Sequence, residues 1–282
     1  MSLEWARILV CFLLACIPAY IWGYIFFKKQ PEPRKWVALT FMAGMVSVVP
    51  IMIYKLTWQW FPALNIFSYT DNLRDDIWGL SNFIAIPLGV VLAFMFVGVL
   101  EEYMKNVVVR IADRKHLRHI DDAIEFCVIA ALGFAFVENV MYFFYIWSYQ
   151  GFDSLFISFI FRSLLSTFAH IFFSGIFGYF YGVAHFANPI LQEEMRANRH
   201  PFLNLFHKVV HLKTSTLFAE EKIMEGLVLA MLLHAFFNIF LEMGWTFLIF
   251  PYLMMGYILL SWLFKKKENH KEYGKVWVVA QE

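Results

Sequence analysis

Long apolar runs and short polar segments alternate along the whole chain. The apolar runs have about the 20 residues that an α-helix needs to cross the hydrocarbon core of a bilayer. We therefore predict about seven membrane-spanning helices, at 8–27, 36–54, 84–111, 124–147, 154–187, 223–243 and 245–264. The predicted fold is an all-α, polytopic membrane helix bundle in which residues 1–282 form a single membrane-embedded domain.

The composition agrees with this prediction. Hydrophobic residues make up 61% of the chain and charged residues 16%, whereas soluble domains average about 45–50% and about 25%. The net charge is +1, and the basic residues are spread over short loops rather than gathered on one face. We therefore expect the lipid bilayer as the surrounding medium and no nucleic-acid partner.

Basic residues are concentrated in alternate loops. They are Lys28, Lys29, Arg34 and Lys35 in the first loop, Arg110, Arg114, Lys115 and Arg118 in the third, Arg196, Arg199, Lys208, Lys213 and Lys222 in the fifth, and Lys265, Lys266 and Lys267 in the tail. The positive-inside rule assigns such loops to the cytosol. We expect a multi-pass protein of the plasma membrane with its N-terminus outside, a cytosolic loop at 188–222 and a cytosolic tail at 265–282.

Two loops have distinctive side chains. The outer loop 55–82 contains Trp58, Trp60 and Trp78, which suits a segment in the membrane interface. In the cytosolic loop, His207 and His211 are four residues apart and would share a helix face, as a pair of metal ligands does. No third ligand accompanies them at a matching spacing, so we interpret this stretch as a solvated amphipathic helix.

The third apolar run carries three charged residues, Glu101, Glu102 and Lys105. Each charge costs roughly 2.5–3.5 kcal/mol at the centre of a membrane helix, so charges persist there mainly at functional sites. On a helix, Lys105 lies one turn from both acids and can offset the charge of one of them. We interpret this cluster as part of a functional site.

Polar residues also interrupt the next three runs. They are Glu138 and Asn139 in the fourth, Arg162, Ser166, His170 and Ser174 at intervals of four in the fifth, and His234 and Asn238 in the sixth. At about 1.5 Å per residue, the acids and histidines all lie roughly 12–23 Å from the cytosolic helix ends, so they can meet in one layer. The catalytic core is then about 84–243. Arg162 has two interpretations, a side chain that reaches the outer face or a member of the site.

These residue types permit two hydrolytic mechanisms. In the first, Glu101 or Glu102 deprotonates a water, and a histidine with a nearby Asn amide stabilises the oxyanion. In the second, Glu138, His170 and His234 bind a divalent metal such as zinc and leave one position open for water. The sequence does not choose between them.

The ordered motifs resemble a known family. They are Glu101-Glu102-x-x-Lys105, Gly133-Phe134-x-x-x-Glu138-Asn139, His170 in a helix rich in small residues, and His234-x-x-x-Asn238. Between about 98 and 242 they resemble the PrsW-type intramembrane proteases, relatives of the CAAX prenyl proteases, which typically have arginine where this chain has Lys105. The resemblance implies proteolysis of membrane-anchored proteins, in the best-known member an anti-sigma factor whose cleavage starts a stress response. It also implies that the Glu101/Glu102 pair is catalytic, and that Glu138, His170, His234 and Asn238 complete the site.

Two other functional classes fit part of the pattern. Acids and histidines inside a membrane also form proton relays, which would suit a proton- or ion-coupled transporter, although no inverted repeat is evident. A membrane scaffold or haem protein with His170 and His234 as axial ligands would leave the Glu-Glu-x-x-Lys motif unexplained. The prediction is therefore an intramembrane endopeptidase, with a transporter as the alternative.

Overall fold

The structure is a computed structural model that describes residues 3–27, 34–73, 77–78, 86–112, 117–186 and 214–268, nearly all of them helical. The long helices are α1 (Leu3–Phe27), α2 (Arg34–Val46), α3 (Val49–Thr57), α5 (Leu88–Ala112), α6 (Ile120–Gln150), α7 (Phe152–Phe161), α8 (Thr167–His185), α11 (Thr214–Glu242) and α12 (Thr246–Glu268). Short elements are η1 (Pro62–Leu64), α4 (Ile66–Asp71) and the antiparallel two-residue strands β1 (Ile77–Trp78) and β2 (Ile86–Pro87). The predicted all-α bundle is confirmed, with this one small strand pair.

Six helical segments in the described part of the chain are long and apolar enough to cross a membrane. They are Glu4–Phe26, Lys35–Thr57, Ile120–Gln150, Phe152–His185, Thr216–Glu242 and Thr246–Leu263. The expectation of seven such spans is therefore wrong by one. The run predicted at 84–111 does form a helix, α5, but the charges of Glu101, Glu102 and Lys105 near its middle exclude it from this class.

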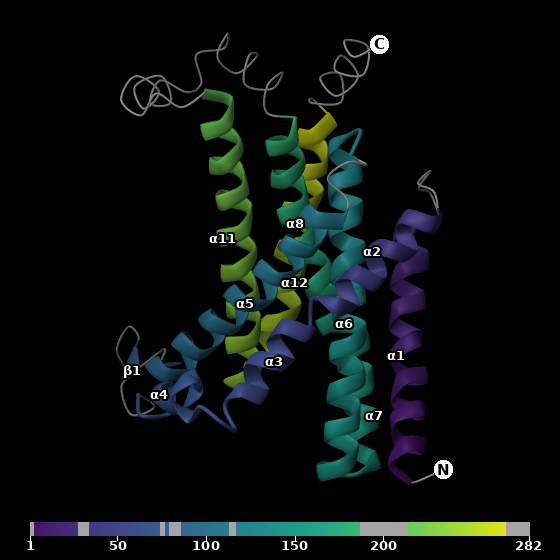
Figure 1. The fold of residues 1–282 in the computed structure, drawn as a ribbon, viewed down its shortest axis with the longest axis vertical. Coiled ribbons are helices and arrows are strands. Elements are labelled where there is room, and N and C mark those ends of the chain that lie inside the picture. Colours follow the sequence, from purple (N-terminus) through teal and green to yellow (C-terminus); the bar gives the residue numbers. More distant parts are fainter. Residues whose placement is uncertain are drawn as a thin grey trace.

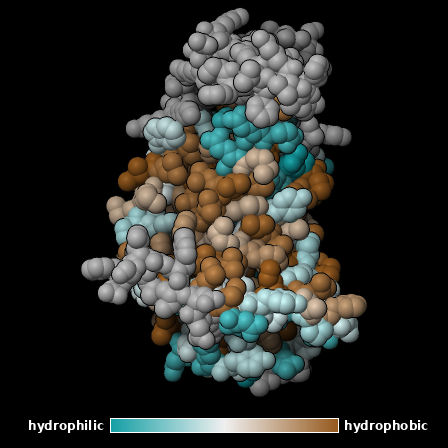
Figure 2. Space-filling model, turned by 90° about the vertical axis from the view of Figure 1, so that its left-hand side faces the viewer, coloured by the Kyte–Doolittle hydropathy of each residue, from teal (hydrophilic) through white to brown (hydrophobic). Residues whose placement is uncertain are grey.

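The bundle has the surface of a membrane protein. Figure 2 shows an apolar band with hydrophilic residues at both ends of the face that it presents. Most long helices run along the longest axis, whereas α5 and the α2–α3 pair run obliquely across it (Figure 1). The start of α1 and the end of α12 lie at opposite ends of that axis. The chain is thus a multi-pass membrane protein.

Helices α6 and α8 form the centre of the core. They pack mainly against each other, and α8 also packs on α11 while α6 packs on α2 and α1. Glycines let α2 and α6 approach closely, because a Cβ on Gly44 would meet the carbonyl of Ala130 and a Cβ on Gly133 would meet that of Phe41. This crossing holds α6 in a fixed rotation, which decides where its polar side chains point.

The single span predicted at 154–187 is a helix interrupted by a π-helical turn, η3 (Arg162–Ser166), between α7 and α8. The N–H of Thr167 donates to the carbonyl oxygen of Arg162, five residues earlier, and the Thr167 hydroxyl donates to the same oxygen at 2.9 Å. Isolated π-turns occur frequently at functional sites, because the extra residue rotates the side chains on one side relative to those on the other.

Several predictions concern segments between and after the long helices. Within 55–82, Trp60 is 71% exposed and Phe61 61%, as a segment in the membrane interface would require. That location stays a prediction. His207 and His211, and the tail after 268, lie outside the described residues.

Candidate active site

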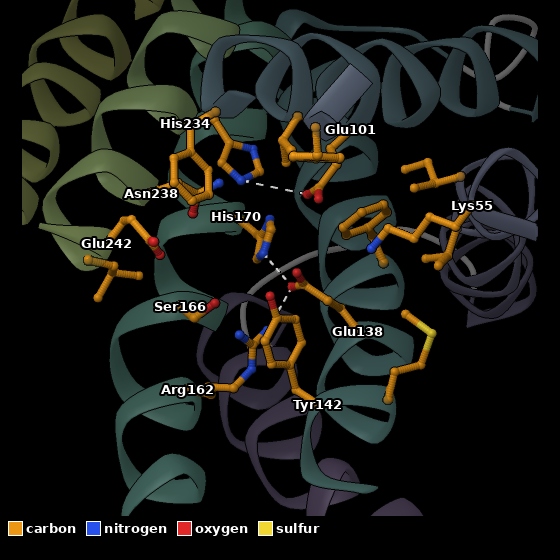
Figure 3. Close-up of a pocket in the computed structure, with 18 residues that line it drawn as sticks. Lys55, Glu101, Glu138, Tyr142, Arg162, Ser166, His170, His234, Asn238 and Glu242 are labelled. Atoms are coloured by element: carbon orange, nitrogen blue, oxygen red, sulfur yellow. Dashed lines mark hydrogen bonds and ion pairs between the residues drawn. The ribbon is translucent and has the colours of Figure 1, made fainter. Parts of the chain in front are cut away.

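Four helices bring the predicted site residues together. Glu101, Glu102 and Lys105 come from α5, Glu138 and Asn139 from α6, His170 from α8, and His234 and Asn238 from α11. They gather around one cavity of about 420 Å³, which Glu101, Glu138, His170, His234 and Asn238 line directly (Figure 3). Glu102, Lys105 and Asn139 are buried behind them. The five lining residues are thus placed to meet a substrate, and the three others to hold them in position.

Glu102 and Lys105 form a buried ion pair at the centre of the site. The Lys105 ammonium donates to Oε1 of Glu102 at 2.6 Å, and the two side chains are 2% and 3% exposed. His234 Nδ1 lies 2.8 Å from the same oxygen. Since a carboxylate only accepts, Nδ1 of His234 carries a hydrogen, and in the neutral imidazole Nε2 then has the lone pair. Nε2 lies 3.6 Å from Oε2 of Glu101, on the cavity side.

His170 lies between two other charged groups. Its Nδ1 is 3.1 Å from the Lys105 ammonium and its Nε2 is 2.8 Å from Oε2 of Glu138. An ammonium group only donates, so Nδ1 accepts, and Nε2 carries the hydrogen that it donates to Glu138. Both ring nitrogens are therefore engaged, and the ring is held edge-on to His234 with 5.1 Å between the ring centroids.

Arg162 belongs to the site. Its Nη2 donates to Oε2 of Glu138 at 2.8 Å and its Nε donates to Oδ1 of Asn139 at 2.8 Å. The guanidinium carbon lies 4.0 Å from the centre of the Tyr142 ring, which places the group over the ring face. Of the two interpretations of Arg162, the structure supports membership of the site.

Asn139 completes this network. Its amide donates to the Thr167 hydroxyl at 3.1 Å, and that hydroxyl in turn closes the π-helical turn. The turn, the arginine and the two side chains of α6 therefore hold one another, because each hydrogen bond fixes the group that makes the next. Sequence reasoning missed Tyr142 and Thr167, and the regular spacing of Arg162, Ser166 and His170 carries no signal of a π-turn.

One group of side chains could hold a metal ion. Glu101, His170 and His234 each offer a ligand atom, and these atoms lie within 4.8 Å of one another. The predicted ligand set had Glu138 in place of Glu101, but Oε2 of Glu138 accepts hydrogen bonds from Arg162 and His170. The geometry groups Glu101 with the two histidines instead.

The residues present fit a divalent ion. Oε2 of Glu101 is buried and makes no hydrogen bond within the described chain. The Nδ1–H of His234 is held by Glu102, which in the neutral imidazole leaves the lone pair of Nε2 for a metal, the usual arrangement for a metal-binding histidine. His170 would have to give up its contact with Lys105 or with Glu138 to become the third ligand. Glu101 and His234 thus each have a ligand atom available, whereas both ring nitrogens of His170 already contact other side chains.

Aromatic side chains enclose the two histidines. The Phe173 ring stacks on His234 with centroids 5.2 Å apart, and the Phe134 ring lies 5.4 Å from His170 and 4.5 Å from the Lys105 ammonium. These rings cover the site on the side of α6 and α8 and keep water from reaching the charged groups there. Electrostatic interactions inside the cavity are therefore stronger than they would be in water.

The chain was compared with known proteins. The sequence profile of the family described as PrsW family intramembrane metalloprotease matches residues 32–264, a range that contains all eight predicted site residues. Neither the curated proteins nor the solved structures contain a significant match.

Proposed function

Because the chain belongs to the PrsW family of intramembrane metalloproteases, we propose that its central cavity hydrolyses peptide bonds of membrane-anchored proteins, such as an anti-sigma factor. Membership makes the chain a protease, so the transporter and haem-protein alternatives are not retained. The observation that carries the proposal is a buried carboxylate oxygen on Glu101 that accepts no hydrogen bond from the part of the chain that the structure describes and faces a cavity shared with His170 and His234.

Glu101 is the better of the two candidate bases. Oε1 of Glu102 already accepts hydrogen bonds from Lys105 and His234, so this oxygen is engaged. Within the described residues, Oε2 of Glu101 accepts no hydrogen bond. A water in the cavity beside Glu101 would therefore give its proton to Glu101 while its oxygen forms a bond to the scissile carbonyl carbon.

The remaining steps need a donor for the oxyanion and a proton for the leaving group. Asn238 lines the cavity one helical turn from His234, and its amide N–H groups can donate to the carbonyl oxygen as negative charge develops there. The C–N bond then breaks as Glu101 returns its proton to the departing amine nitrogen. Glu102 and Lys105 take no proton in this scheme; they hold His234 in position.

Glu101, His170 and His234 would hold a divalent ion such as zinc. When bound, the ion would polarise a water and the substrate carbonyl. Glu101 cannot be a ligand and the free base at the same time. The metal content of the active, purified protein therefore decides between the two roles.

We also propose the plasma membrane as the location, with the start of α1 outside and the end of α12 in the cytosol. The basic loops support this orientation, since 28–35 and 110–118 precede helices that begin at the same end of the bundle as the end of α12 (Figure 1). The end that bears α4 then faces outward. Phe67 of α4 lines the cavity, so a substrate would enter from that side.

The proposal is tested with purified chain reconstituted in liposomes together with detergent-extracted membrane proteins. New protein termini are then identified by mass spectrometry. We expect specific new termini with the wild type and none with Glu101→Gln. Glu221→Gln, an exposed acid elsewhere on α11, should behave as the wild type. Identical termini with wild type and Glu101→Gln would overturn the proposal.

A further inference from the structure

The position of Glu242 in the fold does not stabilise a carboxylate. It is the last residue of α11, where the helix dipole disfavours a carboxylate, and the last turn of α11 has no basic residue. The side chain is exposed, and within the described chain it makes no hydrogen bond or ion pair. It nevertheless lines the cavity, and its carboxylate points inward (Figure 3). A carboxylate in this position is free to contact a substrate bound in the cavity.

Lys55 lies on the opposite wall of the same cavity. It is in the last turn of α3, is exposed, and extends toward the cavity from the side facing Glu242 (Figure 3). The two charges form no ion pair with each other. Among the described residues neither Glu242 nor Lys55 has an ion-pair partner, and the two charges lie on opposing walls with His170 and Glu138 between them in this view.

The spacing fits a bound polypeptide. Glu242 is eight residues after His234, which is about 12 Å along a helix axis. An extended chain advances about 3.3 Å per residue, so about four substrate residues span this distance. Apolar side chains, among them Phe67, Met141 and Leu241, also line the cavity. Such a cavity suits an apolar segment that has charges close to the cleavage point.

We propose that Glu242 and Lys55 select substrates by charge. Glu242 binds a lysine or arginine side chain within about four residues of the scissile bond, and Lys55 favours an acidic side chain on the other side of that bond. The substrate class is thus a membrane-anchored polypeptide whose charge differs across the cleavage point. This inference rests on the proposed protease function.

The test compares cleavage sites in cells producing the wild type, Glu101→Gln, Glu242→Gln, Glu242→Lys or Lys55→Gln, matched for the amount of folded protein in the membrane. Termini that disappear with Glu101→Gln define the cleavage sites. Among these, Glu242→Lys should reduce cuts that have a basic residue within about four positions at least about tenfold, the effect of losing a charge-assisted contact. Glu242→Gln should reduce them less, and Lys55→Gln should reduce cuts that have an acidic residue on the other side of the bond.

The outcomes separate the two proposals. If Glu101→Gln removes specific termini but Glu242→Lys and Lys55→Gln leave the residues around the remaining cuts unchanged, charge selection is wrong and the protease function stands. If no terminus depends on Glu101, the proposed function fails and the inference falls with it. Because Glu242 and Lys55 are exposed, these variants should fold as the wild type does.

Discussion

Replacing Lys105 with methionine removes the ammonium group from a pair that is almost fully buried. Lys105 and Glu102 are 2% and 3% exposed, and their charged atoms are 2.6 Å apart. Breaking such a pair from one side costs about 3–5 kcal/mol, because the remaining charge has no compensation in a medium of low dielectric constant. His234 still donates to Glu102, so we expect a loss near the lower end of this range.

The matched variant Glu102→Gln and the double variant complete a thermodynamic cycle. With both charges gone, neither group is left uncompensated, so the double variant should be more stable than the sum of the two single losses predicts. We expect a coupling free energy of about 1–3 kcal/mol. The free energy of unfolding is measured for all four proteins in mixed micelles, with tryptophan fluorescence as the signal. Losses that add to within about 0.5 kcal/mol would refute the buried ion pair.

Three further predictions concern the site and its support. Arg162→Lys keeps the charge but loses the planar group that contacts Asn139 and stacks on an aromatic ring, so cleavage should fall at least about tenfold while the protein stays folded; activity equal to that of the wild type would contradict this. Gly133→Ala should sharply reduce the yield of folded protein, because its Cβ would meet a backbone carbonyl of α2, whereas Gly175→Ala, whose Cβ would meet only the side chains of Leu260 at 3.3 Å and Val128 at 3.6 Å, should be tolerated. Elemental analysis of the active, purified wild type separates the two roles of Glu101: a divalent metal that is lost in His170→Ala would make Glu101 a ligand, whereas an active, metal-free wild type would make it the base.

Much of the fold follows from the sequence because apolar length and helix formation are local properties. The runs at 124–147 and 223–243 fall on the helices α6 and α11, and the motif residues Glu101, Glu138, His170, His234 and Asn238 do meet around one cavity, as their similar distances from the helix ends predict. The second span, by contrast, is predicted to end near residue 54, which places Lys55 in a loop. In the structure this span continues to Thr57, and Lys55 lies in the wall of the cavity.

The pairing of the site residues could not be predicted in the same way. Which carboxylate faces the two histidines depends on the rotation of each helix about its axis, and contacts such as the close crossing at Gly133 set that rotation. Glu101 rather than Glu138 is grouped with them for this reason. The Thr167 hydroxyl, which closes the π-turn that carries Arg162 to Glu138, accepts a tertiary hydrogen bond from Asn139, and an interval of four residues does not reveal such a contact.

The most direct test of the central claim is a comparison of membrane-protein termini in cells producing the wild type or Glu101→Gln at equal abundance. If the cavity is a protease site with Glu101 at its centre, a defined set of termini will be present with the wild type and absent with the variant, and Glu221→Gln will retain the full set. The same termini in all three cell lines would contradict the assignment of this cavity as the catalytic site.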